Sequence, residues 1–372
     1  MSDLDFMQQA LQLAAQGRFT TSPNPNVGCV IVKDGVVVGR GWHQKAGEGH
    51  AEVHALHEAG EQAQGATAYV TLEPCSHHGR TPPCCEALIA AGIARVVAAM
   101  QDPNPQVAGR GLHRLRQAGV AVEFGLLAEE AELLNRGFLK RMRTGFPWVQ
   151  LKMAASLDGR TAMANGESQW ITSPAARQDV QRYRAQASAI LTTSKTVLAD
   201  NPTMNVRWAQ LDAATQALIG DEQSLRQPVR VVLDRRQQIS AAAAIFTERT
   251  APAWRAITEP SEEDTPWDKS LTIPEHQGHI DVVALMMVLG QQQMNTVWVE
   301  AGATLAGQLL QAGVVDELIL YIAPKLLGSD ARGLCVLPGL EHLSQALEFE
   351  TKDVQQVGPD LRIILQPSSA SA

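Results

Sequence analysis

The sequence predicts two α/β domains in one chain of 372 residues. In the first part, short β-rich runs alternate with amphipathic helical segments, and the same alternation starts again after a break. Such alternation is typical of a sheet that carries helices on its faces. The length also suits roughly two domains, each with a core of its own. Gly145 and Pro147 interrupt the pattern, so we place the domains at residues 1–145 and 146–372.

The first domain should contain an N-terminal helix and a hairpin, followed by four further helices and three further strands. Apolar residues recur at helical spacing from Leu4 to Ala14, with Asp3 as the cap and Gly17 as the stop. Asp34-Gly35 separates VGCVIV from VVVG, and this arrangement predicts a hairpin. Further helices are expected at 51–60, 85–92, 111–119 and 128–141, and further strands at 68–73, 94–100 and 120–124.

The second domain begins with the segment WVQLKMAASLDGR, and apolar strands with helices between them follow it. We expect these strands at residues 189–194, 228–234, 296–302 and 316–324. Residues 236–282 contain an alanine run, scattered prolines and the acidic stretch SEEDTPWD. That composition predicts irregular surface, and we assign the region no role.

Charge and composition narrow the context of the chain. The net charge is −8 and the isoelectric point is near 5.7, so we expect neither nucleic acid nor membrane as a partner. The N-terminus lacks a basic start followed by an unbroken apolar run, and no apolar stretch approaches the ~20 residues that span a bilayer. The five cysteines show no even disulfide spacing. We therefore expect free thiols and a cytoplasmic protein.

One stretch of the first domain indicates a metal site. TLEPCSHHGRTPPCCE at 71–86 holds three of the five cysteines, and HAE lies upstream at 50–52. A hydrolytic zinc site takes three protein ligands and leaves the fourth position to water. His50, Cys75 and either Cys84 or Cys85 would supply three, and we prefer Cys84, with Cys85 turned toward the helix core. Glu52 is then free to move a proton between the water and a departing amine.

The pattern H-x-E followed by P-C-x-x-C is the signature of zinc nucleobase deaminases. This chain departs from it because SHHGRTPP separates Cys75 from the next cysteine. A structural zinc site, or buried cysteines beside surface histidines, is the alternative, and the free carboxylate of Glu52 disfavours it. Two histidines of the loop, His77 and His78, suit substrate contact at least as well as zinc. We interpret Cys29, His54 and His57 as ordinary core or helix residues.

Two sets of motifs resemble those of the bifunctional riboflavin-biosynthesis deaminase/reductases. The deaminase half is matched by PNPNVGCVIV, HAEVHAL, TLEPCSHHGRTPPCCEALI and MQDPNPQVAGRG, and the reductase half by LKMAASLDGRTA, GESQWITS, TVLADNPTMNVR and VEAGATLAGQLLQAG. The resemblance implies a cytidine-deaminase-like α/β/α sandwich followed by a dihydrofolate-reductase-like α/β domain. It also implies one zinc ion per chain on His50, Cys75 and Cys84, with Glu52 as the proton shuttle.

By this resemblance the first domain is a hydrolase that deaminates 2,5-diamino-6-ribosylamino-4(3H)-pyrimidinone 5′-phosphate to 5-amino-6-ribosylaminouracil 5′-phosphate. Family positions near this substrate fall on Asn24, His43, His77, Arg80 and Asn104. The partner implied is thus a small phosphorylated pyrimidine. The resemblance also favours a homodimer.

The second domain contains no G-x-G-x-x-G after a strand, which disfavours a Rossmann dinucleotide site. Gly302 instead separates a strand from a helix start, where backbone N–H groups favour a phosphate, although plain turn chemistry gives the same pattern. The resemblance implies an NADPH-dependent oxidoreductase that reduces the ribosyl group to ribityl. The cofactor positions it implies are Ala154, Trp170, Thr196, Asp200, Gly302, Ala303, Thr304, Leu305, Ala306, Gly307 and Gln308. The substrate positions are Ser168, Arg184, Met204, Arg207 and Glu300, with Lys152 and Asp158 in the same cleft.

Two other classes of function stay open at this point. One is a nucleic-acid or free-nucleoside deaminase joined to an unrelated domain, which the acidic charge balance and the long SHHGRTPP loop disfavour. The other is a zinc-stabilised binding protein without activity, which the free carboxylate of Glu52 disfavours.

Overall fold

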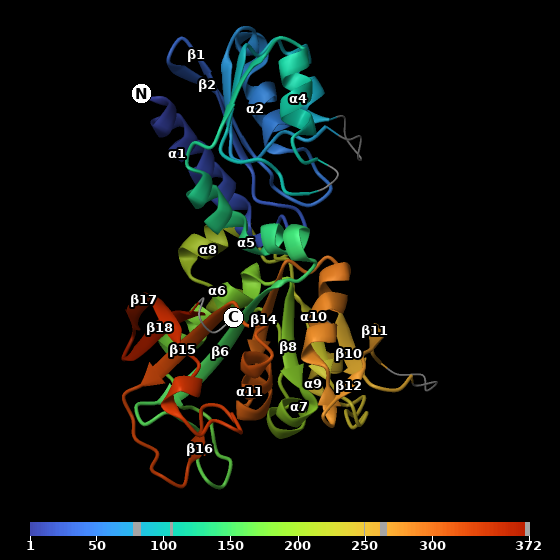
Figure 1. The fold of residues 1–372 in the computed structure, drawn as a ribbon, viewed down its shortest axis with the longest axis vertical. Coiled ribbons are helices and arrows are strands. Elements are labelled where there is room, and N and C mark those ends of the chain that lie inside the picture. The colour runs from blue at the N-terminus through green and yellow to red at the C-terminus, as the bar shows by residue number, and fades with distance from the viewer. Residues whose placement is uncertain (77–82, 105–106, 249, 261–265, 369–372) are drawn as a thin grey trace. The chain divides into compact units, whose positions relative to one another are not determined.

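The computed structural model describes residues 1–76, 83–104, 107–248, 250–260 and 266–368, and the chain forms two compact units (Figure 1). Unit 1 comprises Met1–Gly145 and Leu218–Ser224. Unit 2 comprises Phe146–Ala217 and Leu225–Ala372.

Unit 1 is built on a five-stranded sheet in the order β2-β1-β3-β4-β5. The strands are β1 (Gly28–Lys33), β2 (Val36–Trp42), β3 (Thr67–Val70), β4 (Arg95–Ala98) and β5 (Ala121–Phe124). β1 pairs antiparallel with β2 and β3, and β3, β4 and β5 run parallel. The β1–β2 turn confirms the predicted hairpin, because Asp34 and Gly35 both adopt positive φ, at 49° and 77°.

Helices cover both faces of this sheet. Side chains of a strand point alternately to the two faces, and those of β1 belong to two different cores. Cys29 and Ile31 pack with residues of α2, α3 and α4, whereas Val30 and Val32 pack with residues of α1 and α5. The helices are α1 (Asp3–Ala14), α2 (Ala51–Ala59), α3 (Cys84–Ala90), α4 (Arg110–Gln117) and α5 (Ala128–Thr144), with 3-10 turns η1 (Ala15–Phe19) and η2 (Gly60–Ala63). The predicted α/β/α sandwich is confirmed.

The start and the end of α1 differ from the prediction. Ser2, not Asp3, is the N-cap: the Ser2 hydroxyl accepts from the Asp5 N–H, and the Asp5 carboxylate accepts from the Ser2 N–H. This reciprocal capping box satisfies two N–H groups that would otherwise lack partners. Gly17 lies inside η1 and does not stop the helix.

Unit 2 is built on a nine-stranded sheet in the order β11-β10-β9-β8-β14-β6-β15-β18-β17. The first seven strands run parallel, and β18 and β17 complete the sheet as an antiparallel hairpin. The strands are β6 (Trp148–Ser156), β8 (Ala189–Thr193), β9 (Val229–Leu233), β10 (Ala253–Ile257), β11 (Lys269–Thr272), β14 (Thr296–Glu300), β15 (Glu317–Ala323), β17 (Phe349–Val357) and β18 (Asp360–Pro367).

The prediction that residues 236–282 form irregular surface is wrong. This region contributes β10 and β11 to the main sheet, together with α9 (Ala244–Thr247) and the small hairpin of β12 (Glu275–His276) and β13 (His279–Ile280). The side chain of Arg255, in β10, is buried and donates to Ser270 and Gln237. A buried polar residue such as Arg255 interrupts the apolar run of β10, so the sequence did not indicate a strand there.

Two helical layers cover the main sheet, and β14 shows how its faces are divided. Val297 and Val299 pack with residues of α10 and α11, whereas Trp298 packs with residues of α6. The remaining elements are α6 (Pro174–Gln186), α7 (Ser194–Asp200), α8 (Ala213–Ile219), α10 (Val282–Gln291), α11 (Ala303–Gln311), η3 (Trp208–Gln210), η4 (Leu343–Gln345) and the two-stranded pair of β7 (Arg160–Ala162) and β16 (Arg332–Gly333). Among the helices in the described residues, none is long and apolar enough to cross a bilayer.

Candidate metal centre and cleft

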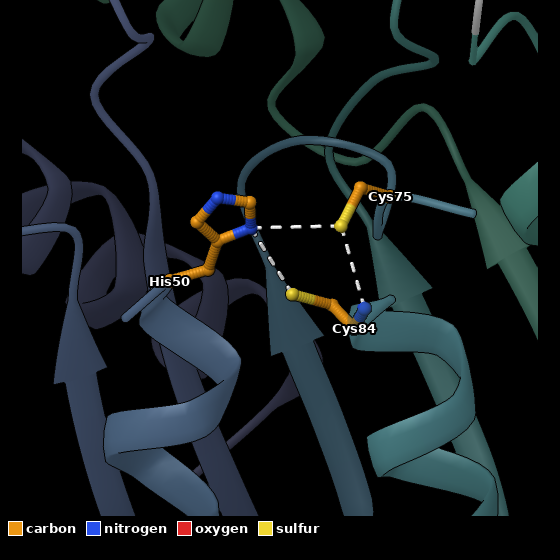
Figure 2. A group of neighbouring side chains, drawn as sticks. All are labelled: His50, Cys75 and Cys84. Atoms are coloured by element: carbon orange, nitrogen blue, oxygen red, sulfur yellow. Dashed lines mark hydrogen bonds between the residues drawn. The ribbon is translucent and has the colours of Figure 1, made fainter. Parts of the chain in front are cut away.

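Three side chains of unit 1 converge on one point, as Figure 2 shows. His50 is the N-cap of α2, Cys84 is the first residue of α3, and Cys75 lies in the segment after β3. His50 Nδ1 lies 3.2 Å from Cys84 Sγ and 3.5 Å from Cys75 Sγ, and the Cys84 N–H donates to Cys75 Sγ at 3.3 Å. The three donor atoms all lie within 4.8 Å of one another.

This donor set fits zinc. Zinc binds histidine nitrogen at about 2.0 Å and thiolate sulfur at about 2.3 Å, so a tetrahedral site requires nitrogen–sulfur separations of about 3.6 Å. The two observed separations, 3.2 and 3.5 Å, are close to that edge length. A hydrogen bond from the Cys84 thiol, together with His50, lowers the pKa of Cys75 to about 4, despite burial. Cys75 is therefore ready to act as a thiolate ligand.

Cys85 points away from this cluster. Its side chain is 1% exposed and packs in the core with Leu88 and Ala55. Cys29 is fully buried in the same core. The geometry therefore brings Cys84 to His50, and leaves Cys85 and Cys29 as packing residues.

Glu52 is the second residue of α2, and its side chain is buried, with 3% exposed. Burial is the largest influence on its carboxyl, and raises its pKa to about 7. The carboxyl also interacts with the Cys84 side chain. A carboxyl with a pKa near neutrality can both accept and release a proton at physiological pH, which suits a general acid and base.

Two more of the predicted residues lie beside the metal ligands. The His43 ring is buried and packs edge-on to the His50 ring, with centroids 5.4 Å apart. His43 Nδ1 lies 3.1 Å from the Gly49 carbonyl oxygen, and His43 Nε2 lies 3.0 Å from Asn24 Nδ2. Asn24 and His43 are thus held as a pair next to the centre. His77 and Arg80 fall outside the described residues.

Asn104 belongs to a loop that one buried carboxylate organises. Glu73 accepts the backbone N–H groups of Asp102, Gly109, Gly111 and Leu112, at 3.2, 2.9, 2.9 and 3.4 Å. Sequence reasoning missed Glu73. The available signal was an acidic residue at the end of an apolar strand, because a buried acid needs several donors.

Unit 2 contains a cleft of about 1560 Å³. It opens where several parallel strands end, since Thr193, Leu233 and Glu300 close β8, β9 and β14 and all line it. Most of the residues predicted for the second domain line this cleft: Lys152, Ala154, Ser168, Trp170, Arg184, Thr196, Asp200, Met204, Arg207, Glu300, Gly302, Ala303, Thr304, Leu305 and Gln308.

Three of the predicted residues do not line the cleft. Ala306 is fully buried, and Gly307 packs against the backbone of Val336, whose oxygen would lie 1.9 Å from an added Cβ. Asp158 accepts the N–H groups of Leu327 and Gly328, at 3.1 and 2.9 Å. These hydrogen bonds indicate that Asp158 stabilises the backbone at residues 327–328.

The N-terminus of α11 makes one end of the cleft suitable for an anionic cofactor. Gly302 is the N-cap, no side chain caps the helix, and an added Cβ at Gly302 would meet nothing within 4 Å. Open N–H groups at a helix start favour phosphate. Lys195 and Arg236 also line the cleft and add positive charge.

A buried ion pair marks another part of the cleft. Arg184 Nε and Nη2 donate to the two carboxylate oxygens of Glu300, at 2.6 and 2.9 Å, and Trp298 Nε1 donates to Glu300 at 2.7 Å. Burial alone would raise the pKa of Glu300, but Arg184 and Lys152 hold it at about 2. Burial lowers the pKa of the Lys152 ammonium. Charged groups are thus fixed within the cleft.

Two protein-family models match the chain. The RibD C-terminal domain matches residues 147–363, and the cytidine and deoxycytidylate deaminase zinc-binding region matches residues 1–100. The two matches cover the cleft and the metal ligands, respectively.

Full-length relatives match across both units. The chain is 66% identical to riboflavin biosynthesis protein RibD of Escherichia coli, over 97% of this chain and 98% of that protein. It is 53% identical to RibD of Haemophilus influenzae, over 98% and 97%. Among solved structures, RibD of Acinetobacter baumannii is 48% identical with a TM-score of 0.90, and covers 99% of both chains.

A more distant solved structure carries a fuller description. A Thermotoga maritima protein, described as a diaminohydroxyphosphoribosylaminopyrimidine deaminase/5-amino-6-(5-phosphoribosylamino)uracil reductase, is 32% identical with a TM-score of 0.85. The match covers 98% of this chain and 99% of that one. The match with this solved structure therefore spans residues of both units.

Proposed function

The chain belongs to the RibD family of bifunctional riboflavin-biosynthesis deaminase/reductases, and on this premise we propose how its residues divide the two reactions. Membership makes the chain an enzyme with a zinc-dependent deaminase domain and an NADPH-dependent reductase domain. We assign deamination to residues 1–145 and reduction to residues 146–372.

In the deaminase domain, the substrate would be 2,5-diamino-6-ribosylamino-4(3H)-pyrimidinone 5′-phosphate. His50, Cys75 and Cys84 would hold zinc, which supplies a Lewis acid that activates water. Glu52 would take one proton from that water and deliver it to the ring nitrogen, and would then move the proton of the new carbon-bound hydroxyl to the amine that leaves as ammonia. Its burial beside Cys84 supports this role. The remaining contacts would come from Asn24, His43, His77, Arg80 and Asn104.

In the reductase domain, NADPH would supply the hydride for C1′ of the ring-opened ribosyl group, which becomes ribityl. The protein would align donor and acceptor carbons in the cleft. We assign Ala154, Trp170, Thr196, Asp200, residues 302–305 and Gln308 to the cofactor, whereas Ala306 and Gly307 pack α11 outside the cleft. We assign Ser168, Arg184, Met204, Arg207, Glu300 and Lys152 to the pyrimidine. For Asp158 the supported role is positioning, through its bonds to Leu327 and Gly328.

Three expectations about context belong to the same proposal. The partner is a small phosphorylated pyrimidine and not a nucleic acid, which the net charge of −8 supports. The compartment is the cytoplasm, which the five free cysteines support. The assembly is a homodimer, which the resemblance to the family supports.

The observation that carries this proposal is the cluster of His50, Cys75 and Cys84 with the buried Glu52 beside it. Its test is ammonia release by zinc-loaded protein from three substrates offered separately: the phosphorylated diaminopyrimidinone, cytidine and single-stranded DNA. Release from the first alone is expected. Release from cytidine or DNA, with none from the pyrimidinone, would replace this function by a nucleoside or nucleic-acid deaminase.

A further inference from the structure

The loop of residues 203–207 contributes three residues to the lining of the reductase cleft, Thr203, Met204 and Arg207. Met204 has a φ of 53°, and its side chain is buried against Ile190 and Trp298. A residue that is not glycine persists in the left-handed region when its surroundings strongly determine its conformation. The loop is therefore expected to be held from outside.

Polar side chains from outside the loop bind its backbone. The Gln227 amide pairs with Val206 in both directions, accepting its N–H and donating to its carbonyl, each at 2.9 Å. Gln181 accepts the Arg207 N–H at 3.0 Å. Arg184 Nη1 donates to the Asn205 carbonyl at 2.8 Å, so the arginine that pairs with Glu300 also holds the loop.

Arg230, in β9, adds the least expected of these bonds. Its side chain is among the largest that are fully buried, and it donates to the carbonyls of Thr203, Glu248 and Ala251. A guanidinium is costly to bury unless its N–H groups find hydrogen-bond partners. The Arg230 guanidinium donates its hydrogen bonds to backbone carbonyl oxygens, and one of these oxygens, that of Thr203, belongs to the loop.

We propose that Gln227 and Arg230 are positioning residues of the reductase, which fix the 203–207 loop so that Met204 and Arg207 meet the phosphorylated pyrimidine. Neither is among the described residues that line the cleft, so both act through the loop. The inference rests on the proposed function. Arg207 carries the positive charge suited to a phosphate, and a preset backbone removes the need to order the loop when substrate binds.

The test uses the full zinc-loaded chain and Gln227→Leu, which removes both bonds to Val206. With 5-amino-6-(5-phosphoribosylamino)uracil varied at saturating NADPH, the KM for the pyrimidine is expected to rise about tenfold. With NADPH varied at saturating pyrimidine, the KM for NADPH should stay within about twofold, because the loop is assigned to the pyrimidine.

Gln150→Leu is the matched control, because Gln150 is also a buried glutamine of unit 2 and donates to Glu317, outside the loop. It should lower the melting temperature while leaving the ratio of the two KM values unchanged. If Gln227→Leu does not fold, Arg230→Lys serves instead, because lysine keeps one donor for the loop, and a smaller rise in the same KM is expected.

Two kinds of result would overturn the proposal, and they are distinguishable from failure of the proposed function. Equal rises in both KM values would give Gln227 and Arg230 a merely structural role, and unchanged values would give them none. If the wild-type protein oxidises no NADPH with this pyrimidine, the reductase assignment itself fails and this proposal fails with it.

Discussion

One buried carboxylate, Glu52, separates a catalytic zinc centre from a structural one. Replacing Glu52 by Gln keeps its shape but removes its ability to carry a proton. We expect ammonia release by Glu52→Gln to fall at least about 10³-fold, because positioned proton transfer contributes on this order. Zinc content, measured by elemental analysis, should stay at one ion per chain, since His50, Cys75 and Cys84 are intact.

Glu58→Gln is the control for this change. Glu58 lies on the same helix, α2, and is exposed, with a single ion pair to Arg40 at 3.4 Å. It should retain full ammonia release. Loss of zinc together with activity in Glu52→Gln would mean that Glu52 maintains the metal site and does not act on the substrate.

The Arg184–Glu300 pair predicts a pH dependence of stability. The folded pKa of Glu300, about 2, lies below its ordinary value of 4.5, so the pair stabilises the fold above about pH 5. That stabilisation is lost as the pH falls from about 5 to about 2. Glu300→Gln should be less stable than the wild type by about 3 kcal/mol at pH 7, because it leaves Arg184 buried without a charge partner.

Urea unfolding at a series of pH values measures this effect. The difference between the wild type and Glu300→Gln should shrink as the pH falls below about 5. Glu275→Gln is the control, because Glu275 is 43% exposed in its pair with Arg235, and such a pair is worth less than about 1 kcal/mol. A difference that stays constant down to pH 3 would contradict the ion-pair account.

For single residues, the sequence predicts those that belong to a recognisable motif. It does not predict those whose side chains bind the backbone of a distant segment. The H-x-E and Cys spacing is enough to select His50, Glu52 and Cys75. Glu73 and Gln227 bind backbone groups of segments far away in the chain, at Gly109 and at Val206. Nothing local in the sequence identifies which loop each will meet.

At the scale of elements, the starts of α2 and α3 account for a zinc site in a chain whose cysteine spacing departs from P-C-x-x-C. His50 caps α2 and Cys84 begins α3, so two helix starts present their ligands at the same edge of the sheet. The segment SHHGRTPP separates the cysteines in the sequence, yet Cys75 lies within reach of both His50 and Cys84. The departure from the P-C-x-x-C spacing is therefore compatible with the same ligand set.

Strand prediction succeeded where a continuous apolar run was present and failed where it was not. The apolar runs of β8, β14 and β15 were predicted because both faces of these strands are buried. In β17, all nine residues are exposed or half-buried, so FETKDVQQV shows no apolar pattern, and no strand was predicted there. Tertiary pairing with β18 creates this strand.

The packing of α11 gives a prediction at the scale of one helix. A Cβ on Gly307 would lie 1.9 Å from the Val336 carbonyl oxygen, which is backbone and cannot swing aside. Gly307→Ala should therefore push the segment around Val336 away from α11, and lower the free energy of unfolding by about 1–3 kcal/mol. Thermal or urea unfolding checks this value.

Gly302→Ala is the matched comparison on the same helix. Its Cβ would meet nothing within 4 Å, and its φ of −77° suits alanine. Stability should change by less than about 1 kcal/mol, whereas the KM for NADPH should rise because the new methyl group enters the cleft. Equal stability for both variants would contradict the packing assigned to Gly307.

At the scale of the whole molecule, the metal centre and the cleft belong to different units. The three metal ligands belong to unit 1, and, among the described residues, all that line the cleft belong to unit 2. Removing zinc with a chelator should therefore abolish ammonia release, and leave NADPH oxidation with 5-amino-6-(5-phosphoribosylamino)uracil nearly unchanged. Restoring zinc should restore deamination. Parallel loss of both activities would show that the reductase depends on the metal centre.

The most direct test of the two-reaction account follows ammonia and NADPH absorbance together in one cuvette, with zinc-loaded protein and the phosphorylated diaminopyrimidinone. We expect ammonia to appear first and NADPH to be consumed after a lag, up to the same molar amount. NADPH consumption without ammonia release would contradict the proposed order. Absence of both signals in folded, zinc-loaded protein would contradict the assignment of this substrate.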